Sequence, residues 1–65
     1  MSRDIEFMET MDPHSLAACR GDEIVASLQW HPQRAPRIVL WREREFTSAE
    51  LRAIADKFDE ESRKR

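Results

Sequence analysis

Glycine is nearly absent from this sequence of 65 residues, with Gly21 as its single representative. Loops that cradle phosphate groups need several glycines, so a glycine-rich nucleotide-binding loop is excluded. The one cysteine, Cys19, excludes an internal disulfide. His14 and His31 do not stand at zinc-ligand spacing from that cysteine. We therefore expect neither a metal ion nor another cofactor.

Long apolar runs are also missing, and no stretch approaches the roughly 18 residues that indicate a transmembrane helix. The first residues lead directly into a charged segment, which lacks the apolar region of a signal peptide. Together with the lone free cysteine, this pattern predicts a cytoplasmic protein without a membrane partner.

The short length limits both the core and the chemistry. Residues 1–65 are expected to form a single domain, and such a small core rarely supplies more than about 3–5 kcal/mol. Because disulfides and metals are not expected, oligomerisation is the remaining common support, which predicts a homodimer. So little material can hardly enclose an active site, so we expect no enzyme and no catalytic residue.

Charge is abundant but unevenly distributed, with 11 basic and 13 acidic residues. The middle of the chain, residues 24–44, has four arginines and one glutamate. Residues 1–23 and 45–61 each have six acidic residues and two basic ones. A basic centre between acidic flanks favours self-association or a protein partner over DNA.

The clearest local signal marks a helix over residues 47–63. Thr47 and Glu50 have the spacing of a capping box, and Phe46 and Leu51 stand at the positions of a hydrophobic staple. Apolar residues then recur with helical spacing, and this stripe is expected to face the core: Leu51, Ile54, Ala55 and Phe58. After this stripe the helix becomes highly charged, which predicts a solvated tail.

Residues 23–42 are predicted to form a β-hairpin. In 23–30, alternation places Ile24, Ala26, Leu28 and Trp30 on one face. The two prolines in 31–36 indicate a loop. A second strand over 37–42 is expected to pair antiparallel, because six residues are too few for a parallel crossover.

Residues 1–22 allow a strand or a short helix. Alternation over 4–8 predicts a short strand. Residues 14–20 fit a two-turn helix capped by Asp12 and Gly21, whereas 16–20 fit a strand that enters a tight turn at Gly21. We favour the strand, because short isolated helices are marginal and another strand stabilises a sheet. The predicted fold is α+β: a small antiparallel β-meander of two to four strands packed against one C-terminal α-helix.

The predicted hairpin combines arginines with tryptophans, and these residues are the candidate partner-binding site: Trp41, Arg34, Arg37, Arg42, Arg44 and Trp30. Arginine and tryptophan are enriched at protein-protein hot spots. In proteins that bind single-stranded nucleic acids, aromatic rings stack on the bases and arginines neutralise the phosphates. Trp30 is in phase with Ile24 and Leu28, so we expect it in the core. Trp41 is out of phase with Ile38 and Leu40, so we expect it at an interface.

These patterns favour a small, non-enzymatic, inhibitor-type protein that binds and modulates a macromolecular partner as a homodimer. Its size and high charge are typical of phage and mobile-element accessory proteins that act on a host system. Two alternatives remain: a nucleic-acid-binding module that uses the arginine and tryptophan hairpin, and a protein that sequesters a small anionic ligand.

Overall fold

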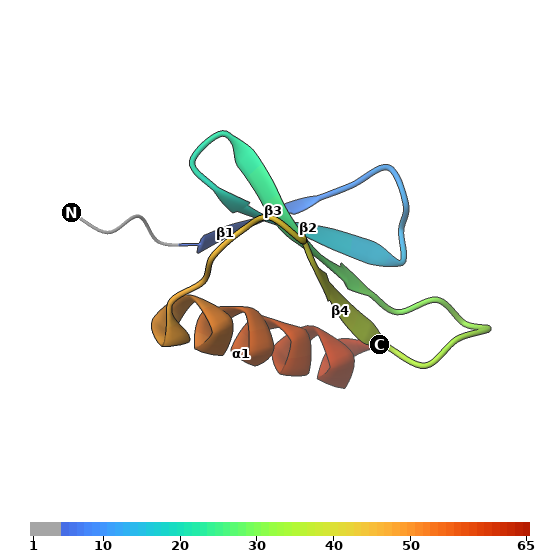
Figure 1. Ribbon diagram of the computed structural model, residues 1–65. Coiled ribbons are helices and arrows are strands. Elements are labelled where there is room, and N and C mark those ends of the chain that lie inside the picture. Colours follow the sequence, from blue (N-terminus) through green and yellow to red (C-terminus); the bar gives the residue numbers. More distant parts are fainter. Residues whose placement is uncertain (1–4) are drawn as a thin grey trace.

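The computed structural model describes residues 5–65, which form a four-stranded antiparallel sheet followed by one helix (Figure 1). The strands follow one another in the sheet in chain order, which makes a simple meander. The elements are β1 (Ile5–Glu9), β2 (Ser15–Arg20), β3 (Glu23–Gln29), β4 (Arg37–Leu40) and α1 (Ser48–Lys64). The predicted α+β fold is confirmed. Asp4, the first residue of the strand predicted over 4–8, lies outside the described residues.

Residues 16–20 form a strand and not the alternative helix over 14–20. β2 pairs with β3 from Ser15 opposite Gln29 to Arg20 opposite Glu23. Gly21 has a φ of 64° and allows the tight turn between the two strands, in a region of backbone conformation that favours glycine. Pairing with strands on both sides outweighs the helical preference of the alanines in β2.

A β-bulge in β3 reverses the predicted facing of its first residues. Ala18 lies opposite Ala26, but Cys19 lies opposite Ile24, so Val25 is the extra residue. An extra residue shifts the alternation by one position. The bulge therefore buries Val25 fully and leaves Ile24 exposed. The prediction that Ile24 shares a face with Ala26 is wrong for this reason.

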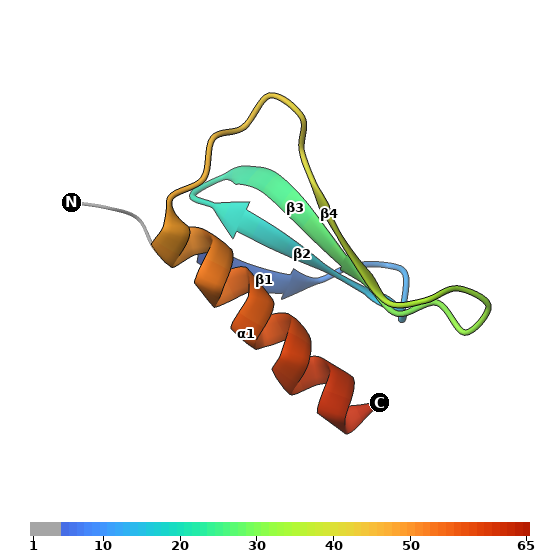
Figure 2. The ribbon, with the colours of Figure 1, turned by 60° about the horizontal axis from the view of Figure 1, so that its bottom comes forward.

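The core lies between the sheet and α1. Its buried residues come from β2, β3 and the helix, together with the residue after β3: Leu16, Ala18, Ala26, Leu28, Trp30 and Ile54. Alanines at the centre of the sheet leave room for larger side chains from the helix. The helix lies closest to β1, and Figure 2 shows β4 at the opposite edge of the sheet.

The predicted capping box is present at the start of α1. The Thr47 hydroxyl accepts a hydrogen bond from the Glu50 N–H at 3.1 Å, and a Glu50 carboxylate oxygen accepts one from the Thr47 N–H at 2.8 Å. The predicted stripe is only partly correct. Ile54 is 1% exposed, whereas Leu51 is 42% exposed and Ala55 is also exposed.

Polar contacts at both ends of the helix account for this rotation. Glu50, Ile54, Phe58 and Ser62 recur every four residues and therefore share one face. At one end, the Arg20 guanidinium donates to both Glu50 carboxylate oxygens at 2.8 and 3.1 Å. At the other end, the indole N–H of Trp30 donates to the Ser62 hydroxyl at 2.8 Å. These bonds direct the face containing Glu50 and Ser62 toward the sheet.

The end of the helix is tied to the sheet and is not a freely solvated tail. The Arg65 guanidinium lies 4.3 Å from the Trp30 ring centroid, and its Nη1 donates to the Pro13 carbonyl at 3.3 Å. The Trp30 ring also stacks on the Phe58 ring, with centroids 5.1 Å apart. The charged tail thus closes one end of the core.

Acid is expected to destabilise the fold through Glu50. The pKa of Glu50 is lowered below 4.5 because its carboxylate accepts the Thr47 backbone N–H and is also paired with Arg20. A carboxyl with a lowered folded pKa stabilises the fold above its unfolded pKa, and this contribution disappears as pH falls through the folded value. The melting temperature should therefore fall as pH decreases below 4.5.

Circular dichroism melts from about pH 7 to pH 3 measure this effect. We expect Glu50→Gln to melt lower than the parent at neutral pH and to show a shallower acid slope. The matched control is Asp56→Asn, which changes an exposed helix carboxylate. An acid slope in Glu50→Gln equal to that of the parent would contradict the assignment.

Candidate protein-binding surface

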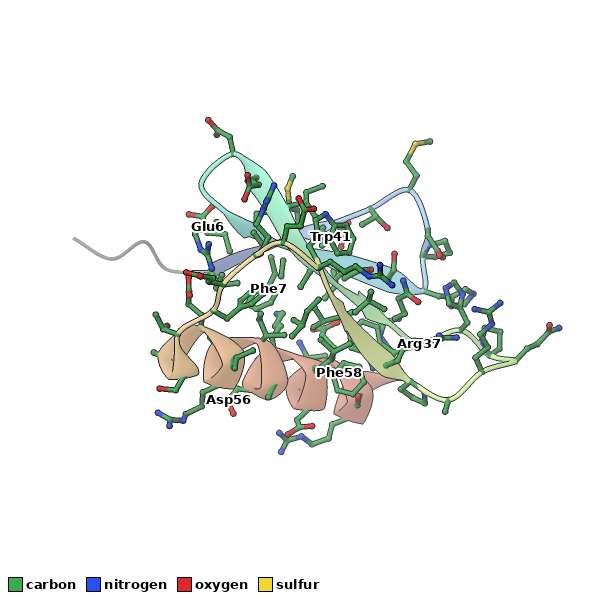
Figure 3. All side chains as sticks on the ribbon, in the orientation of Figure 1. Glu6, Phe7, Arg37, Trp41, Asp56 and Phe58 are labelled. Carbon is green, nitrogen blue, oxygen red and sulfur yellow. The ribbon has the colours of Figure 1, made fainter. Side chains whose placement is uncertain are left out.

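β4 forms a free edge of the sheet. It pairs with β3 from Arg37 opposite Gln29 to Leu40 opposite Ala26, and within residues 5–65 no strand follows it in the sheet order. This register places Ile38 and Leu40 on the helix side of the sheet. Arg37 and Val39 point to the other side. The two labelled ends of the strand region, Arg37 and Trp41, are visible in Figure 3.

Large apolar side chains remain accessible along this edge. The exposed fractions of Ile38, Leu40 and Trp41 lie between 36% and 41%. Since the helix lies nearest β1, it does not shield the β4 side fully. We call residues 37–42 the β4 surface. An exposed apolar edge strand is a site at which proteins pair with other chains, and soluble proteins usually protect it.

Arginines flank these apolar residues at both ends of the β4 surface. Arg37 and Arg42 are exposed, as is Arg34 in the preceding loop. Among residues 5–65, none of these three arginines forms an ion pair with an acidic side chain. Arg44 differs, because its Nε lies 2.6 Å from a carboxylate oxygen of Glu23. Arg44 therefore has an acidic neighbour within the chain, in an ion pair that remains accessible to solvent.

Trp30 and Trp41 occupy different environments. Trp30 belongs to the buried cluster and is held by Phe58, Ser62 and Arg65. Trp41 stands just after β4, where its backbone N–H donates to the Val25 carbonyl at 3.0 Å. This bond fixes the main chain while the side chain stays partly exposed. Of the two tryptophans, Trp41 is the one that offers a substantial aromatic surface to a partner.

Arg34 lies apart from the rest of the predicted set. It lines an open hollow of about 340 Å³ with His14, His31, Pro32 and Gln33. Another open hollow, of about 360 Å³, is lined by residues 40–44. β4 separates the two, and its four residues span about 13 Å. The structure therefore gathers Trp41, Arg42 and Arg44 at one end of the hairpin and leaves Arg34 at the other.

The histidines are organised around a turn. The Asp12 carboxylate accepts the His14 backbone N–H at 2.8 Å, and its other oxygen lies 3.4 Å from Nε2 of His31. No group of three or more potential metal ligands occurs within residues 5–65. Cys19 is buried, five residues from His14 and thus about 16 Å away along an extended chain. This arrangement does not bring a thiol next to an imidazole.

Sequence reasoning missed the accessibility of Ile38 and Leu40. Their alternation correctly indicated a shared face, but not that the helix would leave this face incompletely covered. The available signal was the position of β4 as the last strand of a meander. Such a strand has a free edge. Its side chains lie at the border of the sheet, where a single helix need not cover them.

Within residues 5–65, no helix has the length and apolar content needed to span a lipid bilayer. Comparison of the chain with protein-family models, curated proteins and solved structures returned no match.

Proposed function

We propose that this chain is a non-enzymatic cytoplasmic module that binds a protein through its β4 surface and modulates that protein as a homodimer. The observation that carries this proposal is a row of exposed apolar residues on a free strand edge. The arginines at its ends are exposed and form no ion pair with the acidic residues that the structure describes. Tryptophan and arginine contribute disproportionately to protein binding when a partner excludes water from them. The complementary surface is apolar at its centre and carries carboxylates at its rim.

Nucleic-acid binding receives less support from the arrangement of the side chains. Binding of a single strand relies on several aromatic rings that stack successive bases within a positively charged groove. Here Trp30 is buried, Arg44 is paired with Glu23, and the chain has a net charge of −2. Trp41 alone is a poor platform for several bases. The open hollows also offer a small anion little enclosure.

A comparative pull-down from the cytoplasm tests the proposal. The probes are the parent chain and two surface variants, Trp41→Ala and Arg37→Glu. Matched controls are Leu51→Ala, which removes an equally exposed apolar side chain, and Arg52→Glu, which reverses an exposed helix charge. We expect one protein to be retained by the parent and both controls, and to be reduced at least about tenfold with both surface variants.

The small size and high charge match accessory proteins of phages and mobile elements, so host regulatory and defence proteins are the first partners to examine. Retention of the same proteins by all five chains would contradict the proposal. Binding of an oligonucleotide that weakens steeply with salt and is lost in Arg37→Glu would favour the nucleic-acid alternative.

A further inference from the structure

The backbone of β4 presents an ordered set of free hydrogen-bonding groups. The Trp41 backbone N–H donates a hydrogen bond to the Val25 carbonyl of β3. Residues two apart along an antiparallel strand point their backbone N–H and C=O groups in the same direction. Val39 and Arg37 therefore direct their N–H and C=O groups toward β3, in keeping with their positions opposite Ser27 and Gln29. Ile38 and Leu40 direct theirs away from the sheet. These are the groups available to a further strand.

We propose that the β4 strands of two copies pair antiparallel, with Ile38 of one opposite Leu40 of the other. The two-fold axis then passes between the two Val39 residues. In this register every outward donor meets an outward acceptor, which gives four hydrogen bonds between the copies. A shift of two residues one way places Leu40 opposite Pro36, which has no N–H. A shift the other way places Ile38 opposite Arg42, which lies in the turn after β4, whereas the Trp41 backbone still bonds to β3.

The same register matches side chains on both faces of the joined sheet. On the helix side, Ile38 and Leu40 of both copies form one aliphatic row. On the other side, Arg37 lies opposite Trp41 of the second copy, so each indole ring receives a guanidinium. The two Val39 residues lie between these pairs. The two Arg37 side chains are thus kept apart, and the aliphatic residues meet one another.

The other edge of the sheet is less suited to pairing with itself. β1 carries Glu6 and Glu9, both exposed, and two such strands would bring four carboxylates together. The helix also lies beside β1, where Lys57 approaches the Phe7 ring at 5.9 Å. Pairing of β1 with β4 of another copy would bring opposite charges together. That contact is head-to-tail and would continue into open chains.

This inference rests on the proposed function and adds that a second copy completes the site. The dimer presents two tryptophans and two arginines across its axis, on the sheet face opposite the helices. A pairing of four residues buries less than the roughly 800 Å² per partner of a standard interface, so we expect a dissociation constant in the micromolar range. The binding face for a protein partner would then depend on concentration.

Sedimentation equilibrium of the full chain, from about 1 to 500 µM, tests dimerisation. We expect the mass to rise from 7.7 kDa toward twice that value. Leu40→Lys should raise the dissociation constant at least tenfold, because it places a lysine ammonium from each copy in the aliphatic row. Leu51→Lys is the matched control, since Leu51 and Leu40 are 42% and 41% exposed. Circular dichroism verifies that each variant folds.

Cysteine cross-linking tests the register. In a Cys19→Ala background, Val39→Cys should oxidise to a disulfide-linked dimer, because its Cα atoms would lie about 4.5 Å apart across the axis. Arg37→Cys should not, since the two cysteines would be about 13 Å apart along the strands. A monomer at all concentrations, a ladder of higher oligomers, or preferential cross-linking through position 37 would overturn the inference. A monomer whose partner still requires Trp41 would overturn the dimer and leave only the proposed protein-binding role of the β4 surface.

Discussion

Alanine in place of Trp30 is expected to leave most of the chain unfolded at room temperature. Truncation of a buried tryptophan costs about 3–5 kcal/mol, and a core of this size supplies a similar amount in total. Trp30 joins elements that are distant in sequence: it stacks on Phe58, donates to Ser62 and lies under Arg65. Its loss would therefore release the end of α1 as well as leave a cavity.

Thermal and urea unfolding, followed by circular dichroism, measure this effect. Trp30→Phe is the informative intermediate, because it keeps an aromatic ring beside Phe58 but removes the hydrogen bond to Ser62. We expect Trp30→Phe to lose more stability than Ser62→Ala, whose lost hydrogen bond is worth about 0.5–1.5 kcal/mol. Trp30→Ala melting within a few degrees of the parent would show that this cluster is not the centre of the core.

The sequence contained the local determinants of the fold in readable form. Thr47 and Glu50 predict the start of the helix, because a capping box is formed by two residues three apart in the sequence. Alternation identified β1 and β3, because it also depends on residues that are close in sequence. It did not decide between strand and helix for β2. The bulge at Val25 was not readable, because an extra residue leaves the composition of the strand unchanged and is defined only by its neighbours in the sheet.

Contacts between distant residues explain the remaining differences. In the sequence, Arg44 has the features of a free surface cation, but in the structure it forms an ion pair with Glu23. Arg65 was expected in a solvated tail, but its guanidinium lies over the Trp30 ring. Neither pair has a signature in local spacing.

In contrast, the phase of Trp30 with Leu28 was sufficient to place its ring in the core. Phase did not distinguish Trp41, which is 38% exposed, from Ile38 and Leu40 on the opposite face, which are 36% and 41% exposed.

The free edge of β4 and the small core both favour association of two copies. A strand edge that presents Ile38 and Leu40 to water is unfavourable for a monomer and invites pairing. A domain of 65 residues has little stability to spare. Pairing through β4 would stabilise the folded chain by mass action and assemble its binding face in the same step.

Ile54→Ala is expected to be the most damaging alanine substitution in the helix. Ile54 is 1% exposed and packs with Leu28 and Trp30, so its truncation should cost about 2–5 kcal/mol. Leu51 is the control, because it belongs to the same apolar stripe in sequence but is 42% exposed. Its truncation should cost less than about 1 kcal/mol.

Urea unfolding of the two variants side by side decides between the stripe read from spacing and the rotated helix of the structure. Spacing alone makes Leu51 and Ile54 equivalent, whereas the bonds from Arg20 to Glu50 and from Trp30 to Ser62 direct Ile54 inward. Comparable losses in Leu51→Ala and Ile54→Ala would mean that the helix packs through the stripe. A large loss in Ile54→Ala alone would show that the helix packs with Ile54 inward and Leu51 toward the solvent.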